Sequence, residues 1–230
     1  MHIMEGFLPS PWWEIWFLVS LPFIVIGLYQ LDRLVKEKRE ALPLLAVAGA
    51  FVFVLSSLKL PSFNVSCSHP TGTGLGGILF GPCIAAVLGL IVLIFQAVFL
   101  AHGGITTLGA NVFSMGIAGP AVAYLIYKAG TRAGANTYAT VFLAAALADL
   151  VTYVVTSIQL ALAFPAATGF FEAFSAFAAI FAVTQVPLAI VEGAVIALVF
   201  KYIVQLKPEI LTRLNLLSES TVKKLQEAAA

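Results

Sequence analysis

Charged residues are scarce in this sequence. Lys, Arg, Asp and Glu together make up 10% of the 230 residues, whereas apolar residues make up 61% and the mean hydropathy is +1.03. A soluble domain carries about 25% charged residues, so this composition excludes a water-soluble enzyme. The net charge of +1 leaves no basic groove for a nucleic acid, and we expect no nucleic-acid partner. The composition is that of an integral membrane protein.

Motifs of several other classes are also missing. The two cysteines, Cys67 and Cys83, are too few for a disulfide scaffold and form no C-x-x-C pair. The sequence has no G-x-x-x-x-G-K-[ST] loop to hold the phosphates of ATP. If the protein's function requires ATP hydrolysis, the energy must come from elsewhere. It has neither a nucleophile elbow nor an H-E-x-x-H zinc motif. We therefore expect a non-enzyme without a bound cofactor.

Long apolar runs predict the membrane crossings. The first run has no basic residue before it and no A-x-A-like site after it, so we expect no signal peptide and take residue 1 as the mature amino terminus. All the runs are near or above the ~20 residues that a spanning helix needs. The six runs are Pro11–Tyr29, Leu42–Leu58, Gly76–Ala101, Leu108–Lys128, Tyr138–Phe164 and Ala173–Tyr202.

The positions of the basic residues call for a seventh crossing. These residues gather in segments 33–39, 128–132 and 201–224, which the positive-inside rule places together in the cytoplasm. An even number of crossings must therefore separate the first two segments. A helix break at Gly81-Pro82 supplies the additional crossing, because proline cannot continue the helical ladder. The resulting segment Thr71–Gly81 is too short to span a bilayer alone and must be shielded by neighbouring helices.

We predict an all-α membrane protein on this basis. The fold is a bundle of about seven transmembrane helices in the inner cell membrane. The amino terminus lies outside and folds back into the bundle, and the carboxyl terminus is cytoplasmic. Residues 1–204 form a single transmembrane domain, and residues 205–230 form a short cytoplasmic tail.

All three histidines, His2, His69 and His102, fall on the outer face of this map. A histidine in second position lets a free amino terminus bind a transition metal through the α-amine, the His2 amide nitrogen and the imidazole Nδ1, which together close adjacent chelate rings. One further imidazole completes a square-planar set, which suits Ni²⁺. We assign that place to His69, so the predicted metal ligands are Met1, His2 and His69, and residues 1–204 become a metal-binding domain.

Segments rich in glycine and hydroxyl groups surround the later histidines. Pro70 fixes the backbone after His69, and the nearby glycines permit the folded-in loop that a preformed site requires. Cys67 is either a thiolate ligand or a small buried apolar residue, and we favour the latter. His102, Thr106 and Asn111 are candidates for groups that orient the ligating imidazoles.

Other polar and small residues inside the apolar runs leave an alternative open. Asp149 and Glu192 are ionisable groups in a costly environment, so they are functional suspects. They would serve as the relay of a self-sufficient divalent-cation channel or secondary carrier, although a structural hydrogen bond explains Asp149 equally well.

Ala46 and Ala50, four residues apart, form a face of small side chains on which a partner helix can pack closely.

Four segments carry a resemblance to a known family. They read MHIMEGFLP, SCSHPTGTGLG, LFGP and QAVFLAHGGITTLGAN, at residues 1–9, 66–76, 79–82 and 96–111. Over nearly the whole chain, the sequence resembles the CbiM/NikM family, the substrate-specific (S) membrane components of energy-coupling-factor (ECF) transporters for cobalt and nickel.

The resemblance implies a function, a ligand set and partners. A member of this family captures Co²⁺ or Ni²⁺ on the outer face. It works with a transmembrane coupling (T) subunit and two cytoplasmic ATPase subunits, with a small accessory membrane subunit as an optional partner. The family also implies that the amino terminus binds the metal through Met1 and His2, together with a histidine of the loop that here carries His69.

Overall fold

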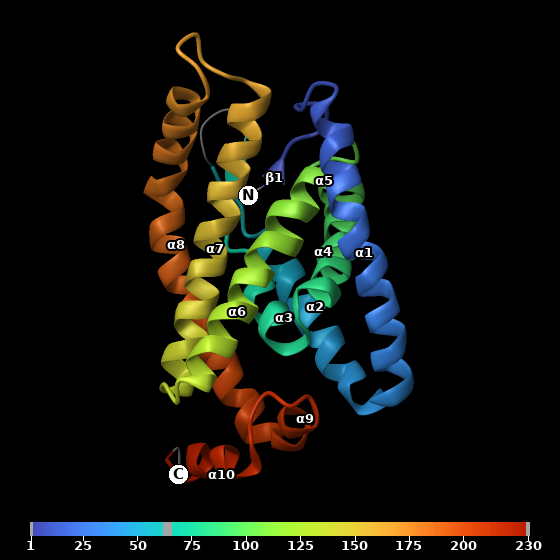
Figure 1. The fold of residues 1–230 in the computed structure, drawn as a ribbon, viewed down its shortest axis with the longest axis vertical. Helices are drawn as coiled ribbons and strands as arrows, with labels where there is room; N and C mark the ends of the chain where they lie inside the picture. The colour runs from blue at the N-terminus through green and yellow to red at the C-terminus, as the bar shows by residue number, and fades with distance from the viewer. Residues whose placement is uncertain (1, 62–65, 229–230) are drawn as a thin grey trace.

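Six apolar helical segments form the body of the protein (Figure 1). The computed structural model describes residues 2–61 and 66–228, and six of the described segments are long and apolar enough to cross a membrane. The chain is therefore a multi-pass helical membrane protein, as predicted. The segments are α1 (Trp12–Glu37), η1 with α2 (Arg39–Ala41 and Leu42–Ser57), α4 (Pro82–Leu100), α5 with η2 and α6 (Leu108–Asn111, Val112–Ala118 and Gly119–Arg132), α7 (Thr137–Ala163) and α8 (Phe170–Leu206).

A short buried helix lies between α2 and α4. This helix, α3 (Thr73–Phe80), ends at Gly81, and α4 begins at Pro82, so the helix break is where the sequence predicted it. Every residue from Thr73 to Leu79 is buried. A Cβ atom on Gly77 would lie 2.5 Å from the carbonyl oxygen of Pro120, so only glycine lets α3 and α6 approach this closely. Neighbouring helices enclose α3, which keeps its backbone away from lipid.

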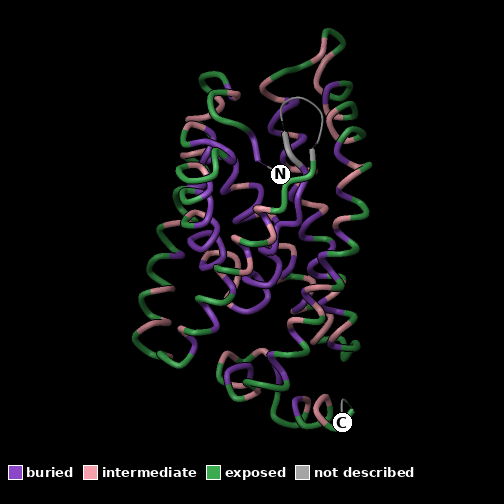
Figure 2. The backbone as a smooth tube through the Cα atoms, turned by 180° about the vertical axis from the view of Figure 1, so that it is seen from behind, coloured by how far each residue is buried: buried purple, intermediate pink, exposed green. Residues whose placement is uncertain are grey.

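The outermost helices present apolar side chains to the surroundings. α1 and α8 are the least buried of the six candidate spans. Figure 2 shows buried residues gathered in the middle of the bundle and exposed residues along its flanks. Leu18 on α1 is 69% exposed and Val183 on α8 is 76% exposed. Apolar surface of this extent marks a face that contacts lipid.

A small sheet corrects the prediction of a purely helical fold. β1 (His2–Ile3), β2 (Leu60–Pro61) and β3 (Ser66–Ser68) form an antiparallel sheet in the order β1-β3-β2. Strands of two or three residues are too short to show the alternating pattern by which strands are recognised in a sequence. The sheet joins the amino terminus to the segment that follows α2.

The segment after α8 folds into two short helices at the lower end of Figure 1. These are α9 (Pro208–Arg213) and α10 (Glu219–Glu227). Leu211 and Val222 are buried in the same core cluster as Phe200 of α8, so the tail packs onto the bundle. The predicted domain boundary after residue 204 falls just before the end of α8 at Leu206.

The two ends of the bundle differ in charge. The amino-terminal strand β1 lies in the upper half of the bundle in Figure 1, near α5, whereas α9 and α10 lie at the lower end. Eleven of the twelve Lys and Arg residues belong to the lower ends of helices, to the connections between them or to the tail. The exception is Lys59, which follows α2 at the upper end.

Candidate metal centre

The pairing of β1 with β3 brings the first described residue, His2, to a buried position inside the bundle. His2 lies opposite Cys67 and Ile3 lies opposite Ser66 in this antiparallel register. The side chain of His2 thereby reaches His69, which follows the end of β3. The two histidines are 67 positions apart in sequence, and the strand pairing brings them together.

Three imidazole rings meet at this place. Nδ1 of His2 lies 2.6 Å from Nε2 of His69. The ring centroid of His102 lies 4.0 Å from that of His2 and 5.2 Å from that of His69. One ring nitrogen from each histidine can be chosen so that all three lie within 4.8 Å of one another. All three side chains are buried, with no more than 3% exposed.

The arrangement of the His2 and His69 nitrogens suits a shared metal ion. Imidazole nitrogens bind transition metals at about 2.0 Å, so two of them at right angles around one ion lie about 2.8 Å apart. The observed separation of 2.6 Å is close to this value. His69 is also held in orientation, because its Nδ1 lies 2.9 Å from the carbonyl oxygen of Pro70. Nε2 is therefore the nitrogen that faces His2.

Burial lowers the pKa of each of these histidines. The pKa values of His2 and His69 lie well below 6.5, chiefly because burial disfavours the charged ring, and nearby positive groups add to the effect. Burial, followed by the charge of Lys59, lowers the pKa of His102 to about 3. All three rings are consequently neutral at physiological pH, and the neutral ring is the form that binds a metal.

These pKa values predict that the metal-free protein loses stability in acid. Because the folded-state values are lowered, the unfolded chain binds more protons below pH 6.5, and the free energy of unfolding falls as the pH decreases. For His102 alone the loss between pH 6.5 and pH 5 is about 1.5 kcal/mol. Thermal unfolding in detergent at pH 7 and pH 5 measures the effect. His102→Gln should reduce the pH dependence of the melting temperature. An unchanged pH dependence in this variant would show that the lowered pKa of His102 does not contribute to it.

The amino-terminal segment is fixed by side chains that follow His102. Asn111 accepts a hydrogen bond from the Ile3 amide at 2.8 Å and donates one to the Ile3 carbonyl oxygen at 3.0 Å. The Thr107 hydroxyl donates to the same carbonyl oxygen at 2.7 Å, and the Thr106 hydroxyl accepts from the Gly6 amide at 3.0 Å. Thr106 and Asn111 therefore hold the main chain on the carboxyl side of His2, and their predicted role in orienting the imidazoles stays a prediction.

Glycine at position 103 makes room for His2. Its φ is +79°, and a Cβ atom there would lie 3.0 Å from Cδ2 of His2 and 3.2 Å from Nδ2 of Asn111. Any other residue would be strained in this conformation and would press on the ring. The glycine-rich turn after His102 thus allows three rings to pack together.

The sequence did not single out several residues at the site. One of them is Thr107, whose hydroxyl donates to the Ile3 carbonyl oxygen. Gln96 on α4 contacts the His2 ring, partly opposing the decrease of its pKa, and donates to the hydroxyl of Ser56 at 2.7 Å. Gln185 on α8 donates to the carbonyl oxygen of His69 at 3.4 Å. Two buried glutamines within apolar helices were the available signal, because an amide in such a run needs polar partners.

The remaining predicted residues lie in different places. Met1 lies outside the described residues, so its amine stays a prediction. Ala46 and Ala50 are exposed on α2. Asp149 and Glu192 are buried on α7 and α8, with 0% and 1% of their surfaces exposed.

One family profile matches nearly the whole chain. The family is CbiM, described as the cobalt uptake substrate-specific transmembrane region, and the match covers residues 2–210. The chain belongs to the CbiM family. The putative cobalt transport protein CbiM 2 of Methanosarcina barkeri (strain Fusaro) is 64% identical to it over 98% of both chains. The cobalt transport protein CbiM of Nostoc sp. is 56% identical, covering 94% of this chain and 84% of that protein.

A solved structure and a fused protein are also similar to this chain. The crystal structure of a truncated transition metal transporter superposes with a TM-score of 0.76 at 25% identity, covering 89% of this chain and 99% of that one. A putative fused cobalt transport protein CbiMQ of Methanocorpusculum labreanum is 53% identical over 98% of this chain, which covers 38% of the fused protein. This CbiM family member therefore has the fold of a solved metal transporter.

Proposed function

We propose that this protein is the substrate-binding membrane subunit of an ECF-type ABC transporter for cobalt or nickel. The buried cluster of His2, His69 and His102 carries the proposal. In it Met1, His2 and His69 bind Co²⁺ or Ni²⁺, which is the transported substrate, and the neighbouring His102, Thr106 and Asn111 support them. The names of the relatives, which are cobalt transport proteins, support the same function.

The choice between the two metals follows from ligand chemistry and supply. Nitrogen ligands in a plane favour Ni²⁺ and Cu²⁺ over Co²⁺ by the usual order of affinities. Relatives named for cobalt transport favour Co²⁺ as the physiological substrate. Use of cobalt then reflects its availability and the partner proteins rather than intrinsic affinity.

The charge asymmetry supports capture from outside. The end of the bundle that carries eleven of the twelve basic residues is the cytoplasmic end by the positive-inside rule. The histidine cluster then lies toward the outer face, and α3 together with the six longer segments makes seven passes. In this orientation the amino terminus is outside, the carboxyl terminus is cytoplasmic, and the protein resides in the inner cell membrane.

Partners must supply the energy for transport. The sequence contains no ATP-binding loop, and the fused CbiMQ relative indicates that a second transport component works beside a CbiM protein. The proposed partners are a transmembrane coupling (T) subunit and two cytoplasmic ATPase subunits, with a small accessory membrane subunit as an optional addition.

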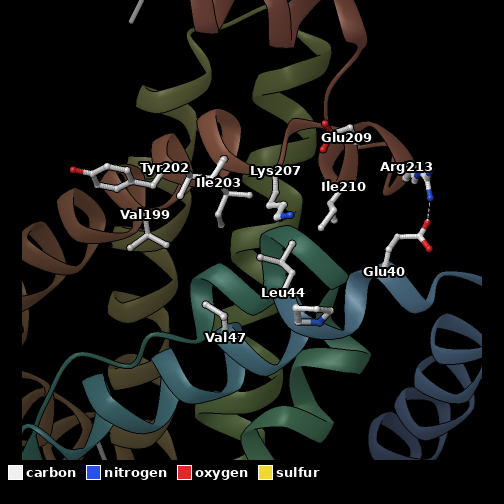
Figure 3. A pocket seen from close by; sticks show the side chains of 12 residues that line it. Glu40, Leu44, Val47, Val199, Tyr202, Ile203, Lys207, Glu209, Ile210 and Arg213 are labelled. Carbon is white, nitrogen blue, oxygen red and sulfur yellow. Dashed lines mark hydrogen bonds and ion pairs between the residues drawn. The ribbon is translucent and has the colours of Figure 1, made fainter.

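An apolar groove at the cytoplasmic end offers the coupling subunit a surface (Figure 3). It has a volume of about 630 Å³ between α2 and the end of α8, and the ion pair of Glu40 with Arg213 lies at one side. The exposed Ala46 and Ala50 continue the same face of α2, and small residues let a partner helix approach closely. The groove is lined by Leu44, Val47, Val199, Tyr202, Ile203 and Leu206.

Bulky side chains on α2 are expected to block this contact. In cells that express both subunits, Ala46→Trp and Ala50→Trp should each reduce copurification with the coupling subunit at least about tenfold, because the partner helix can no longer approach. Ala176→Trp, at an exposed position on the outer half of α8, serves as the matched control. Ni²⁺ binding by the isolated subunit should not change. Full copurification of both α2 variants would place the coupling subunit elsewhere.

Metal binding and vesicle uptake test the function itself. The purified protein should bind about one Ni²⁺ or Co²⁺ per chain with the square-planar ligand set. Vesicles that contain the protein with its partners should accumulate the metal only with ATP, and vesicles that contain the protein alone should not. Sustained flux through the protein alone would support the alternative, a channel or carrier that uses Asp149 and Glu192.

A further inference from the structure

Two buried carboxylates connect the His69 loop to the helices beneath it. Glu192 on α8 accepts three hydrogen bonds from the residues after Pro70, namely from the Thr71 amide at 2.5 Å, the Thr71 hydroxyl at 2.8 Å and the Gly72 amide at 2.8 Å. Both carboxylate oxygens are used. Glu192 therefore binds the loop where it turns into α3.

A second connection starts from Asp149 on α7. The amide nitrogen of Gln185 lies 3.3 Å from each carboxylate oxygen of Asp149 and 3.4 Å from the carbonyl oxygen of His69. Asp149 thus orients Gln185, and Gln185 donates to the main chain of His69 itself. The loop is held on both sides of Pro70.

Burying the side chains of Asp149, Gln185 and Glu192 is costly, which indicates that their contacts with the His69 loop have a role. Asp149, Gln185 and Glu192 are each no more than 1% exposed. Ionisable groups within membrane helices are costly to bury, so those that are present usually have a function. Glu192 accepts hydrogen bonds from two backbone amides and from the Thr71 hydroxyl of one loop, and these donors would lose this partner without it. The position of the loop, and hence of His69, depends on this carboxylate.

We infer that Glu192, together with the Asp149–Gln185 pair, positions His69 against His2 for metal binding. This inference rests on the proposed metal-binding function. Without the anchor the His69 ring leaves its place 2.6 Å from Nδ1 of His2, and the protein must spend binding free energy to restore it. These residues act through His69 and do not touch the metal, and the same contacts explain why both acids lie inside the bundle without a role in ion passage.

The test compares Ni²⁺ affinity with folding stability in detergent. Glu192→Gln places an amide group against the amide donors of the loop, so we expect Ni²⁺ affinity to fall by about 10–100-fold, as for other groups that orient a ligand. The d–d absorption band of bound Ni²⁺ should also shift, because the His69 nitrogen leaves the plane. Glu172→Gln, at an exposed position on the same helix, is the matched control and should bind like the wild type.

Substitutions at Thr71 separate positioning from general stabilisation. Thr71→Val removes the hydroxyl that donates to Glu192 and accepts from the Thr73 hydroxyl, and it should weaken Ni²⁺ binding. Thr71→Ser keeps this hydroxyl and should bind like the wild type. If Glu192→Gln fails to fold, this pair decides the question alone. In the double variant Thr71→Val with Glu192→Gln, the loss should be smaller than the product of the single losses, because both remove one shared contact.

The outcomes distinguish the anchor from the site. If the variants at Glu192 and Thr71 lower the melting temperature of the metal-free protein but keep wild-type Ni²⁺ affinity and absorption, the positioning role is overturned. The proposed function survives that result, because the wild type still binds metal. If the wild type itself binds no Ni²⁺, the proposed function fails, and the inference fails with it.

Discussion

Alanine in place of His69 is expected to abolish tight Ni²⁺ binding. The His69 ring nitrogen that faces His2 is part of the proposed donor set, at 2.6 Å from the other imidazole donor. Its removal should cost more than the ~100-fold that follows from loss of an orienting group. Titration calorimetry of the purified variant measures this, with the melting temperature of the metal-free protein showing that the fold is kept.

His102→Ala provides the comparison within the same cluster. We expect it to weaken Ni²⁺ binding by about 10–100-fold, as for a residue that orients a ligand. The ring of His102 is close to that of His2, with centroids 4.0 Å apart, so distance alone does not separate the two roles. Equal losses in His69→Ala and His102→Ala would make His102 a ligand, and full binding by His69→Ala would remove His69 from the set.

One residue added before Met1 is the second change with a large expected effect. The strand register places His2 opposite Cys67, and the contacts of Asn111 with Ile3 hold that register. The added residue therefore leaves the His2 ring in place but turns the terminal amine into a peptide nitrogen within the chain. The chelate loses a donor, and we expect tight Ni²⁺ binding to be lost.

A matched extension makes this result interpretable. The same residue added after Ala230 lies at the opposite end of the chain and should leave Ni²⁺ affinity unchanged. Affinity that is undiminished by the amino-terminal extension would show that the amine is not a ligand, and the three imidazoles would then be the complete protein contribution to the site.

Much of the helical architecture could be predicted from the sequence. The six apolar runs correspond to the six candidate spans, and the helix break falls at Gly81-Pro82, as proline chemistry predicts. These features are encoded locally, because hydropathy and a missing amide hydrogen act within a few residues. The small sheet was not predictable, since its strands are two or three residues long and are stabilised only by each other.

Only the part of the candidate site that depends on local sequence features could be predicted. Charge placement put the loops of His2, His69 and His102 on one face, and the structure shows the three rings in one cluster. The roles of Thr107, Gln96 and Gln185 were not visible, because each depends on which side chain or carbonyl group lies across from it. Thr106 and Asn111 contact the main chain of the amino-terminal segment, and their role in orienting the imidazoles stays a prediction.

The sequence by itself determined that this chain lies in a membrane, where its helices break, which of its ends is basic and which three residues can offer imidazole nitrogen to a metal. The tertiary structure decided that the amino-terminal strand pairs with the segment before His69, and that Glu192 and Gln185 hold that loop from below. Hydropathy and proline act on neighbouring residues and can be read along the chain. A strand pair or a buried hydrogen bond joins residues that are tens of positions apart, and only packing determines which groups meet.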